Sequence, residues 1–413
     1  MDKHDNTDNH QLISTSPSFR TDLAKKLEEL VPEAIADGRV DVVRLKELLA
    51  EDAGEPNERF GLFWPGKKQA LRAAQDPTTA TLRPAKDESK DWDTTNNIFI
   101  EGDNLEVLKV LQKQYHNSIK MIYIDPPYNT GKDFVYPDNF KEGLQNYLEF
   151  SQQVDEGNKK ISTNTETAGR YHSNWLNMMY PRLKLARNLL TDDGVIFISI
   201  DDAEQANLKK ICDEIFGEGN FVSQIVWQKK YAPQNDAKYF STSHDYILIY
   251  ARSIERFSRN LLPRSKEQLA RYKNIDNDPR GPWQSDNFTV ATYSASYDYP
   301  ITLPSGRTIN PTPGRCWRTS YENYKKLVAD NRISFGLDGD NVPRIKRFLS
   351  EVQDGSVPET LWLYKDVGHN QGAATSLKNL MDGKKYFDYP KPVTLIEFMA
   401  KIASSRDSLI LDF

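Results

Sequence analysis

The sequence predicts an α/β protein built on a largely parallel sheet, and two patterns carry this prediction. Apolar runs of strand length, such as "IKMIYID" and "GVIFISID", are hydrophobic enough to be buried on both faces. Segments with helical periodicity, such as "AEQANLKKICDEIFG", stand between these runs. Strands that alternate with helices in this way are typical of a parallel sheet with helices on its faces.

The pattern along the 413 residues suggests five segments. Residues 1–20 are polar and aperiodic, which predicts a disordered tail, and residues 21–95 combine amphipathic helices with a linker. The alternation of strands and helices occupies residues 96–251. Residues 252–360 are rich in Tyr, Pro, Arg and Asn, which predicts a separate insert, and residues 361–413 return to a helix and a buried strand, "SLILDF".

Composition excludes several classes of protein. Apolar residues make up 38% and charged residues 27%, a balance typical of soluble globular chains. We find no apolar run of membrane-spanning length, and the polar N-terminus lacks a signal-peptide core, so we expect a cytoplasmic protein without a membrane anchor. The two cysteines suffice neither for a disulfide framework nor for a cysteine-based site, so no metal is expected.

The net charge of −5 conceals an uneven distribution. Residues 252–349 carry 17 Lys and Arg against 10 Asp and Glu, so a basic segment lies within an acidic chain. Such a segment is a candidate module for binding a polyanion. Chance clustering on a solvated face is the alternative, and charge alone does not separate the two.

The stretch "MIYIDPPYN" carries the candidate chemistry. In open parallel sheets ligands bind beyond the carboxyl ends of the strands, and this predicted strand ends at Asp125. A carboxylate there can accept protons from an amino group. Pro126 and Pro127 fix a turn that can aim a backbone carbonyl at the same group, while Tyr128 offers a flat face to a planar base. A plain surface turn also favours Pro and Asn and remains the alternative.

A second acid is predicted at the same edge of the sheet. The run "NIFIEGDNLEVL" reads as a strand, a turn and a helix, so Asp103 would end a strand neighbouring the one before Asp125. Asp103 and Asn104 can equally cap the following helix.

An ordered set of segments resembles the β-class DNA amino-methyltransferases. "DPPY" after an apolar strand resembles their catalytic motif, most often in enzymes that act on adenine N6, while "GDNLEVL" before it and "KPVTLIEFMAKIA" after it fit the permuted order. The helical N-terminus and "DPPYNTGKDFVYPD" resemble the modification (Mod) subunit of type III restriction-modification systems, over roughly residues 20–413. The resemblance implies a Rossmann-like methyltransferase sheet in permuted order, a helical N-terminal region and a target-recognition insert.

The resemblance also implies methyl transfer from S-adenosylmethionine to adenine N6 in double-stranded DNA. The adenine would be flipped out of the duplex to stack on Tyr128, while Asp125 and the Pro126 carbonyl bind its N6 protons. The implied residues form two groups: the catalytic Asp125, Pro126, Pro127 and Tyr128, and the cofactor-binding Asp103, Asn104, Lys391, Pro392, Asp412 and Phe413. Lys391 and Pro392 also fit a simple helix start.

In this family a Phe-x-Gly-x-Gly loop that holds the cofactor follows the "KPVTLIE" segment. The chain stops at Phe413, where that loop would begin, so we expect its cofactor-binding half to be truncated. Two other functions stay open: methylation of cytosine N4, and a catalytically inactive, truncated DNA-binding relic. A homodimer and a separate restriction (Res) subunit are the expected protein partners, and the recognition sequence is not predicted.

Overall fold

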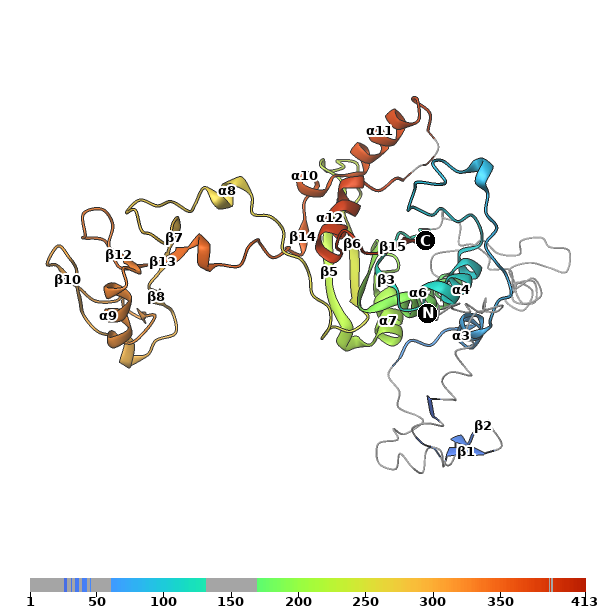
Figure 1. Ribbon diagram of the computed structural model, residues 1–413, viewed down its shortest axis with the longest axis horizontal. Coiled ribbons are helices and arrows are strands. Elements are labelled where there is room, and N and C mark those ends of the chain that lie inside the picture. Colours follow the sequence, from blue (N-terminus) through green and yellow to red (C-terminus); the bar gives the residue numbers. More distant parts are fainter. Residues whose placement is uncertain are drawn as a thin grey trace, which may run out of the picture. The chain divides into compact units, whose positions relative to one another are not determined.

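The computed structural model describes residues 61–130, 169–385, 387 and 389–413, with short stretches at 26–27, 31, 34–36, 39–42 and 45. Contacts divide the chain into two compact units (Figure 1). Unit 1 comprises Met1–Asn260 and Glu359–Phe413, and unit 2 comprises Leu261–Pro358. The predicted tail and most of the predicted N-terminal helices lie outside the described residues.

Unit 1 is built on a six-stranded sheet with the order β14-β5-β6-β4-β3-β15. The strands are β3 (Ile119–Ile124), β4 (Leu190–Ile200), β5 (Phe221–Gln228), β6 (His244–Ala251), β14 (Leu361–Trp362) and β15 (Ile410–Asp412). β3 pairs in parallel with β4 and β15, β14 pairs in parallel with β5, and β6 is antiparallel to β4 and β5. Five strands therefore end at one edge of the sheet, here named the carboxyl edge.

The α/β prediction is confirmed, but the sheet is mixed rather than wholly parallel. β5 and β6 are joined by residues 229–243, which contain no helix. A parallel crossover carries the chain over a face of the sheet, usually as a helix. A direct loop returns the chain antiparallel, and this is the geometry of β6.

Helices cover both faces of this sheet. On one face, Ile122, Ile124, Ile196 and Ile198 pack into a single core with α3 (Lys67–Gln75), α4 (Asn104–Tyr115), α6 (Gly169–Leu189) and α7 (Gln205–Phe216). Because side chains alternate along a strand, the intervening residues point to the opposite face, and α12 (Val393–Ala403) contacts β3 and β4. Burial of each isoleucine contributes about 1.5–3 kcal/mol, which makes β3 and β4 the rigid centre of unit 1.

The strand expected within residues 96–103 is wrong. These residues form no strand, and Phe99 is 93% exposed. Asp103 instead caps α4, because its side chain accepts a hydrogen bond from the Glu106 backbone N at 3.1 Å. An apolar run forms a strand only where it can pair with another strand. β3 already pairs with β4 on one side and with β15 on the other, so it offers no side to residues 96–103.

The remaining elements of unit 1 are short or peripheral. They are β1 (Ile35–Ala36), β2 (Arg39–Val40), α10 (Tyr364–Val367), α11 (Asn370–Leu380) and the 3₁₀ turns Lys86–Glu88 and Glu218–Asn220. Pro181 lies inside α6, which continues through it. None of the described helices is long and apolar enough to cross a membrane.

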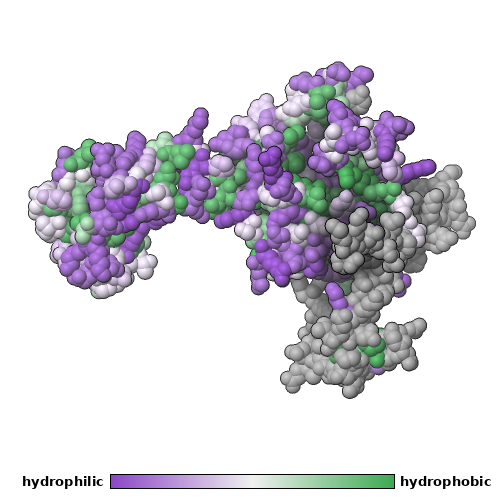
Figure 2. All heavy atoms as spheres, in the orientation of Figure 1, coloured by the Kyte–Doolittle hydropathy of each residue, from purple (hydrophilic) through white to green (hydrophobic). Residues whose placement is uncertain are grey.

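Unit 2 consists of small antiparallel elements around its own core. A three-stranded sheet has the order β12-β13-β7, and β8 pairs with β11 and β9 with β10. The elements are α8 (Lys266–Leu269), β7 (Trp283–Asn287), β8 (Thr289–Val290), β9 (Ile301–Thr302), β10 (Thr308–Ile309), β11 (Cys316–Trp317), α9 (Tyr321–Ala329), β12 (Ile333–Ser334), β13 (Arg344–Phe348) and the 3₁₀ turns Ala295–Tyr297 and Leu349–Glu351. Phe288, Trp317 and Tyr324 centre the core, while hydrophilic side chains dominate the visible surface of unit 2 (Figure 2).

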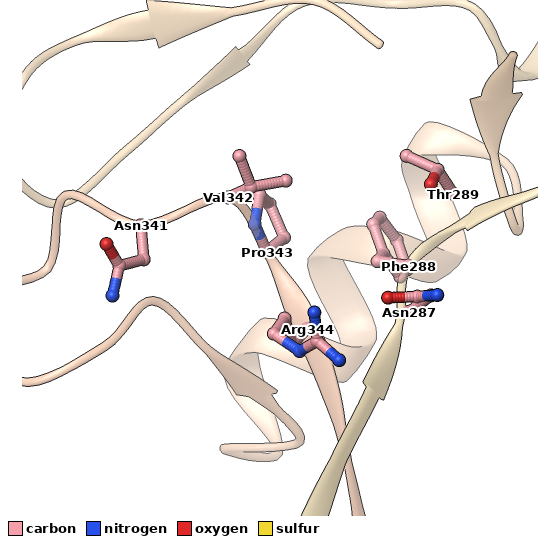
Figure 3. Close-up of a pocket in the computed structure, with 7 residues that line it drawn as sticks. All are labelled: Asn287, Phe288, Thr289, Asn341, Val342, Pro343 and Arg344. Atoms are coloured by element: carbon pink, nitrogen blue, oxygen red, sulfur yellow. The ribbon is translucent and has the colours of Figure 1, made fainter. Parts of the chain in front are cut away.

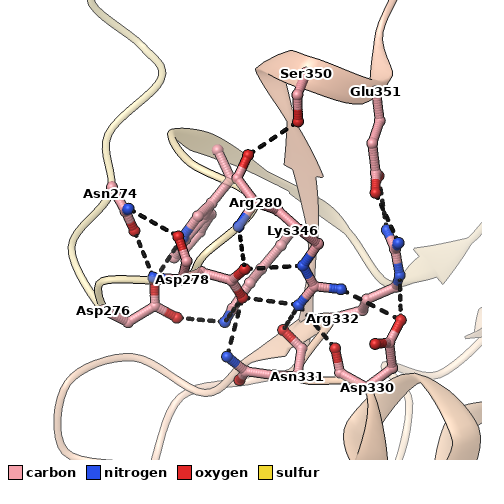
Figure 4. A network of polar contacts seen from close by, with 11 residues as sticks. Asn274, Asp276, Asp278, Arg280, Asp330, Asn331, Arg332, Lys346, Ser350 and Glu351 are labelled. Atoms are coloured by element: carbon pink, nitrogen blue, oxygen red, sulfur yellow. Dashed lines mark hydrogen bonds and ion pairs between the residues drawn. The ribbon is translucent and has the colours of Figure 1, made fainter.

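Much of the positive charge of unit 2 is neutralised internally (Figure 4). Asp278 is buried and accepts hydrogen bonds from Arg280 at 2.8 Å, which hold the pKa of its carboxyl well below the usual range. Lys346 is also buried; it pairs with Asp276 and lies 3.8 Å from Asp278. Arg332 forms a two-pronged pair with Glu351, at 2.7 Å for each bond. The surface of unit 2 is therefore less positively charged than its excess of Lys and Arg residues indicates.

Candidate active site

Asp125 is the first residue after β3 and therefore stands at the carboxyl edge. Its Oδ2 lies 2.6 Å from Lys391 Nζ, and the two side chains are 27% and 12% exposed. On the neighbouring strand β15, Asp412 is in register with Tyr123, two residues before Asp125. Partial burial, together with the negative charge of Asp125, raises the pKa of the Asp412 carboxyl.

A hydrogen bond from α6 fixes the turn after Asp125. The Trp175 indole of α6 donates a hydrogen bond of 2.6 Å to the Pro127 carbonyl, and this tryptophan is fully buried. No described residue donates to the Pro126 carbonyl. The turn therefore leaves one of its two proline carbonyls available beside the Asp125 carboxylate.

Tyr128 packs against the core of unit 1. Burial raises the pKa of its hydroxyl well above the usual range, and the nearby charge of Asp125 adds to this effect. The hydroxyl forms no hydrogen bond of acceptable geometry with a described residue. Lys391 Nζ lies 5.1 Å from the centre of the Tyr128 ring, within the range of a cation–π contact. Asp125, the Pro126 carbonyl and the Tyr128 ring are here named the clamp.

A buried carboxylate that sequence reasoning missed supports the clamp. Glu204, at the start of α7, accepts hydrogen bonds from Asn129 Nδ2 at 2.5 Å and Asn207 Nδ2 at 2.8 Å, and it lies 2.6 Å from His172 Nδ1. Asn129 has a φ of 61°, a left-handed conformation that Asn tolerates better than most residues. The signal in the sequence was the acid-rich "DDAE" after β4, another strand that ends at the carboxyl edge.

A second ion pair lies beside the clamp. Lys229, just after β5, pairs with Asp245 of β6, whose side chain is only 3% exposed. Burial raises the pKa of Asp245 to about 6, and the charges of Lys229 and Lys391 oppose that shift. Lys391 thus interacts electrostatically with two carboxylates on different strands.

The backbone of Lys391 is positioned by a glycine. Gly368 has a φ of 85°, and a Cβ added there would stand 2.8 Å from Pro392 Cβ and 2.7 Å from Thr394 Oγ1. Thr394 Oγ1 donates to the Val367 carbonyl at 2.7 Å, and the buried Trp227 indole donates to the Gly368 carbonyl at 3.1 Å. The end of β5 is thereby linked to the start of α12.

The six residues expected to bind a cofactor fall into two places. Asp412 ends β15 beside the clamp, Lys391 contacts Asp125, and Pro392 and Phe413 are their chain neighbours. The other two lie at the start of α4. Asp103 is its N-cap and lies 3.8 Å from the Arg182 guanidinium, and Asn104 is its first residue, whose Oδ1 accepts a hydrogen bond of 2.6 Å from Arg182. Their role in cofactor binding stays a prediction.

Comparison with known proteins identifies the family. A family model described as DNA methylase (N6_N4_Mtase) matches residues 119–413. This chain belongs to that DNA methylase family. Its match begins at β3 and extends to the end of the chain, so it contains the entire clamp. The expected Rossmann-like α/β sheet is therefore the sheet of a DNA methylase.

The resemblance to type III Mod subunits is confirmed by two relatives of this DNA methylase. The StyLTI Mod subunit of Salmonella typhimurium (strain LT2) is 36% identical over 99% of this chain and 64% of its own length. The EcoPI Mod subunit of Escherichia phage P1 is 34% identical over 89% of this chain and 61% of its own length. The chain thus spans less than two thirds of these relatives.

Among solved structures, the PvuII DNA methyltransferase (cytosine-N4-specific) matches with a TM-score of 0.35 at 11% identity, over 74% of this chain and 71% of that one. Within the described part of this DNA methylase, no three His, Cys, Asp or Glu residues are grouped to hold a metal ion.

Replacing Gly368 with alanine tests the link between Gly368 and Lys391. We expect Gly368→Ala to lower the free energy of unfolding by about 2–4 kcal/mol, because it adds a clash with Pro392 to an unfavourable φ. Gly383→Ala is the matched control: its φ is 83°, but a Cβ there meets nothing within 4 Å. We expect the control to cost about 1 kcal/mol. Denaturant unfolding of both variants measures the difference, and equal losses would contradict the proposed clash.

The buried Asp245 predicts a pH dependence of stability. Because its pKa is raised from 3.8 to about 6, the folded state holds the proton over a pH range in which the unfolded state releases it. Stability contributed by this group is therefore lost as pH rises from about 4 to about 6. Relative to Asp245→Asn, the free energy of unfolding should fall by roughly 1–3 kcal/mol across that window. Urea unfolding at a series of pH values measures this, and a pH-independent difference would refute it.

Proposed function

We propose that this chain is the catalytic part of a site-specific DNA methyltransferase that transfers a methyl group from S-adenosylmethionine to adenine N6. The clamp carries the proposal: a carboxylate, a carbonyl to which no described residue donates, and a largely buried aromatic ring meet at the carboxyl edge of a DNA methylase sheet. An exocyclic amine on a planar base offers two N–H donors and an aromatic face, which match these groups.

The residues of the clamp would act by positioning. The Asp125 carboxylate and the Pro126 carbonyl accept the two amino protons, which directs the nitrogen lone pair away from both acceptors. Tyr128 fixes the plane of the flipped base by stacking on it. Glu204 and Trp175 hold the turn, so these groups need little rearrangement when the base arrives. A proton lost from the methylated nitrogen would pass to Asp125 or to water.

The residues around the clamp fit S-adenosylmethionine by charge. This cofactor carries a sulfonium and an ammonium as well as a carboxylate. Asp125 and Asp412 stand on adjacent parallel strands and suit the cationic groups, while Lys391 suits the carboxylate. When bound, the cofactor supplies the activated methyl group.

We infer that unit 2 reads the DNA sequence. A hollow of about 300 Å³ on this unit is lined by residues that include Asn287, Thr289, Asn341 and Arg344 (Figure 3). Arg344 and Asn287 are paired across β13 and β7, and both are exposed. Arginine binds guanine edges and asparagine binds adenine edges in the major groove. Arg344 also forms no ion pair with any described residue, unlike Arg280 and Arg332.

Partners follow from the names of the relatives. Because the relatives are Mod subunits of type III restriction-modification enzymes, we propose that this chain is a modification component. It would work as a homodimer on double-stranded DNA, in the cytoplasm, with a separate restriction subunit.

Replacing Asp125 tests the proposed methyl transfer. Asp125→Asn should lower methyl transfer to plasmid DNA by at least about 100-fold, because the variant loses the charged acceptor for the amine. Asp193→Asn is the control, since Asp193 forms a surface pair with Lys120 at 2.7 Å. Incorporation of tritiated methyl groups, followed by nucleoside analysis, measures the rate and the product. If the product is N4-methylcytosine, the methylated group is cytosine N4 and not adenine N6. An inactive wild-type protein would favour a DNA-binding relic.

Replacing Arg344 tests the proposed recognition of DNA by unit 2. Arg344→Ala should weaken discrimination at one base pair by about 1–3 kcal/mol, roughly tenfold to 100-fold, while other positions keep their preference. Arg307→Ala is the control, because Arg307 pairs with Asp340 at 2.9 Å. Selection of bound sequences from a random DNA library measures the preference at each position. An unchanged preference in the Arg344 variant would remove this residue from recognition.

A further inference from the structure

Lys391 contacts two groups of the clamp. Its ammonium lies 2.6 Å from the Asp125 carboxylate and 5.1 Å from the Tyr128 ring centre. These are two of the three groups that the proposed function assigns to the target base. A lysine ammonium and a base amine are both N–H donors, and both compete for one carboxylate.

The side chain of Lys391 can leave while its backbone stays. Pro392 is the N-cap of α12, and the contacts with Gly368 and Thr394 fix this helix start. The ammonium sits on a flexible four-carbon stem. Displacement of the ammonium therefore needs rotations of the side chain and no movement of the sheet.

We propose that Lys391 is a placeholder cation, which compensates Asp125 when the clamp is empty and is displaced by the amino group of the target base. This inference rests on the proposed function and deepens it. Lys391 is a positioning residue in this role, because it prepares the carboxylate that contacts the substrate.

The surroundings of Lys391 explain why a placeholder is needed. Asp125, Asp245 and Asp412 gather at the carboxyl edge, and Lys229 already pairs with Asp245. Without Lys391, the Asp125 carboxylate would stand partly buried without a counter-charge. Burial raises the pKa of Asp245, and the charges of Lys229 and Lys391 oppose that shift, so a displaced Lys391 still has an acidic neighbour.

The proposal has a measurable consequence for base binding. A base with an exocyclic amine must displace Lys391, and the broken ion pair lowers its net affinity. Thymine has no exocyclic amine. Where adenine carries its amino group, thymine presents a carbonyl oxygen, which cannot donate a hydrogen bond to the Asp125 carboxylate. Removing the placeholder should therefore strengthen binding of adenine and leave binding of thymine unimproved.

The test compares fluorescein-labelled oligo(dA) and oligo(dT) by anisotropy with the full chain. Lys391→Met should raise the ratio of oligo(dA) to oligo(dT) affinity by about threefold to tenfold, because the amine no longer breaks an ion pair. Lys391→Gln should behave in the same way if the methionine variant folds poorly. Lys391→Arg keeps the cation and should keep the wild-type ratio.

Two further variants serve as controls. Lys401→Met removes a charge from α12, the helix that follows Lys391, at a site that is 64% exposed and 3.9 Å from Glu397, so it should leave the ratio unchanged. Asp125→Asn should lower the ratio, and in this background Lys391→Met should produce no gain.

The results distinguish failure of the placeholder role of Lys391 from failure of the proposed function of the clamp. A gain with Lys391→Met that depends on Asp125 supports both. If Asp125→Asn lowers the ratio but neither neutral variant at Lys391 raises it, the placeholder is overturned and the clamp stands. If Asp125→Asn leaves the ratio unchanged, the clamp fails and the placeholder fails with it.

Discussion

The parallel pairing of β3 with β4 on one side and β15 on the other is the constraint on which the site depends. Parallel strands bring their carboxyl ends to one edge of the sheet, and ligands bind at that edge in open α/β sheets. Asp125 follows β3, Glu204 follows β4 and Asp412 ends β15. β3 and β4 are fixed by apolar side chains buried on both faces of the sheet, with the isoleucines on one face, so the position of the clamp follows from hydrophobic packing rather than from the polar groups.

The carboxylates at the carboxyl edge are compensated by lysine side chains. Three carboxylates, Asp125, Asp245 and Asp412, converge there and are offset by Lys229 and Lys391. Burial raises the pKa of two of these acids, so every cation nearby affects how the site holds its charge. An arrangement of this kind suits a reaction that admits a cationic cofactor and a neutral amine in turn.

Unit 2 shows how misleading a count of charges can be. Its excess of Lys and Arg suggested a surface for a polyanion, but Arg280, Arg332 and Lys346 are consumed by internal pairs around Asp278 and Glu351. Buried charges need partners: Arg280 pairs with Asp278 two residues away, whereas Lys346 meets Asp278 from a distant part of the segment. Arg344 is exposed and pairs with no carboxylate in the described part of the chain, so it is the better candidate for contact with DNA.

By itself, the sequence determined the α/β class, the strand that ends at Asp125 and the DNA methylase family, because hydrophobic periodicity and a compact motif are local signals. It did not determine that residues 96–103 lack strand structure, that β6 runs antiparallel or that Glu204 supports Asn129. The contact of Lys391 with Asp125 joins residues far apart in the chain. Only tertiary structure decides such pairs, because the energy of a buried charge depends on which groups folding brings beside it.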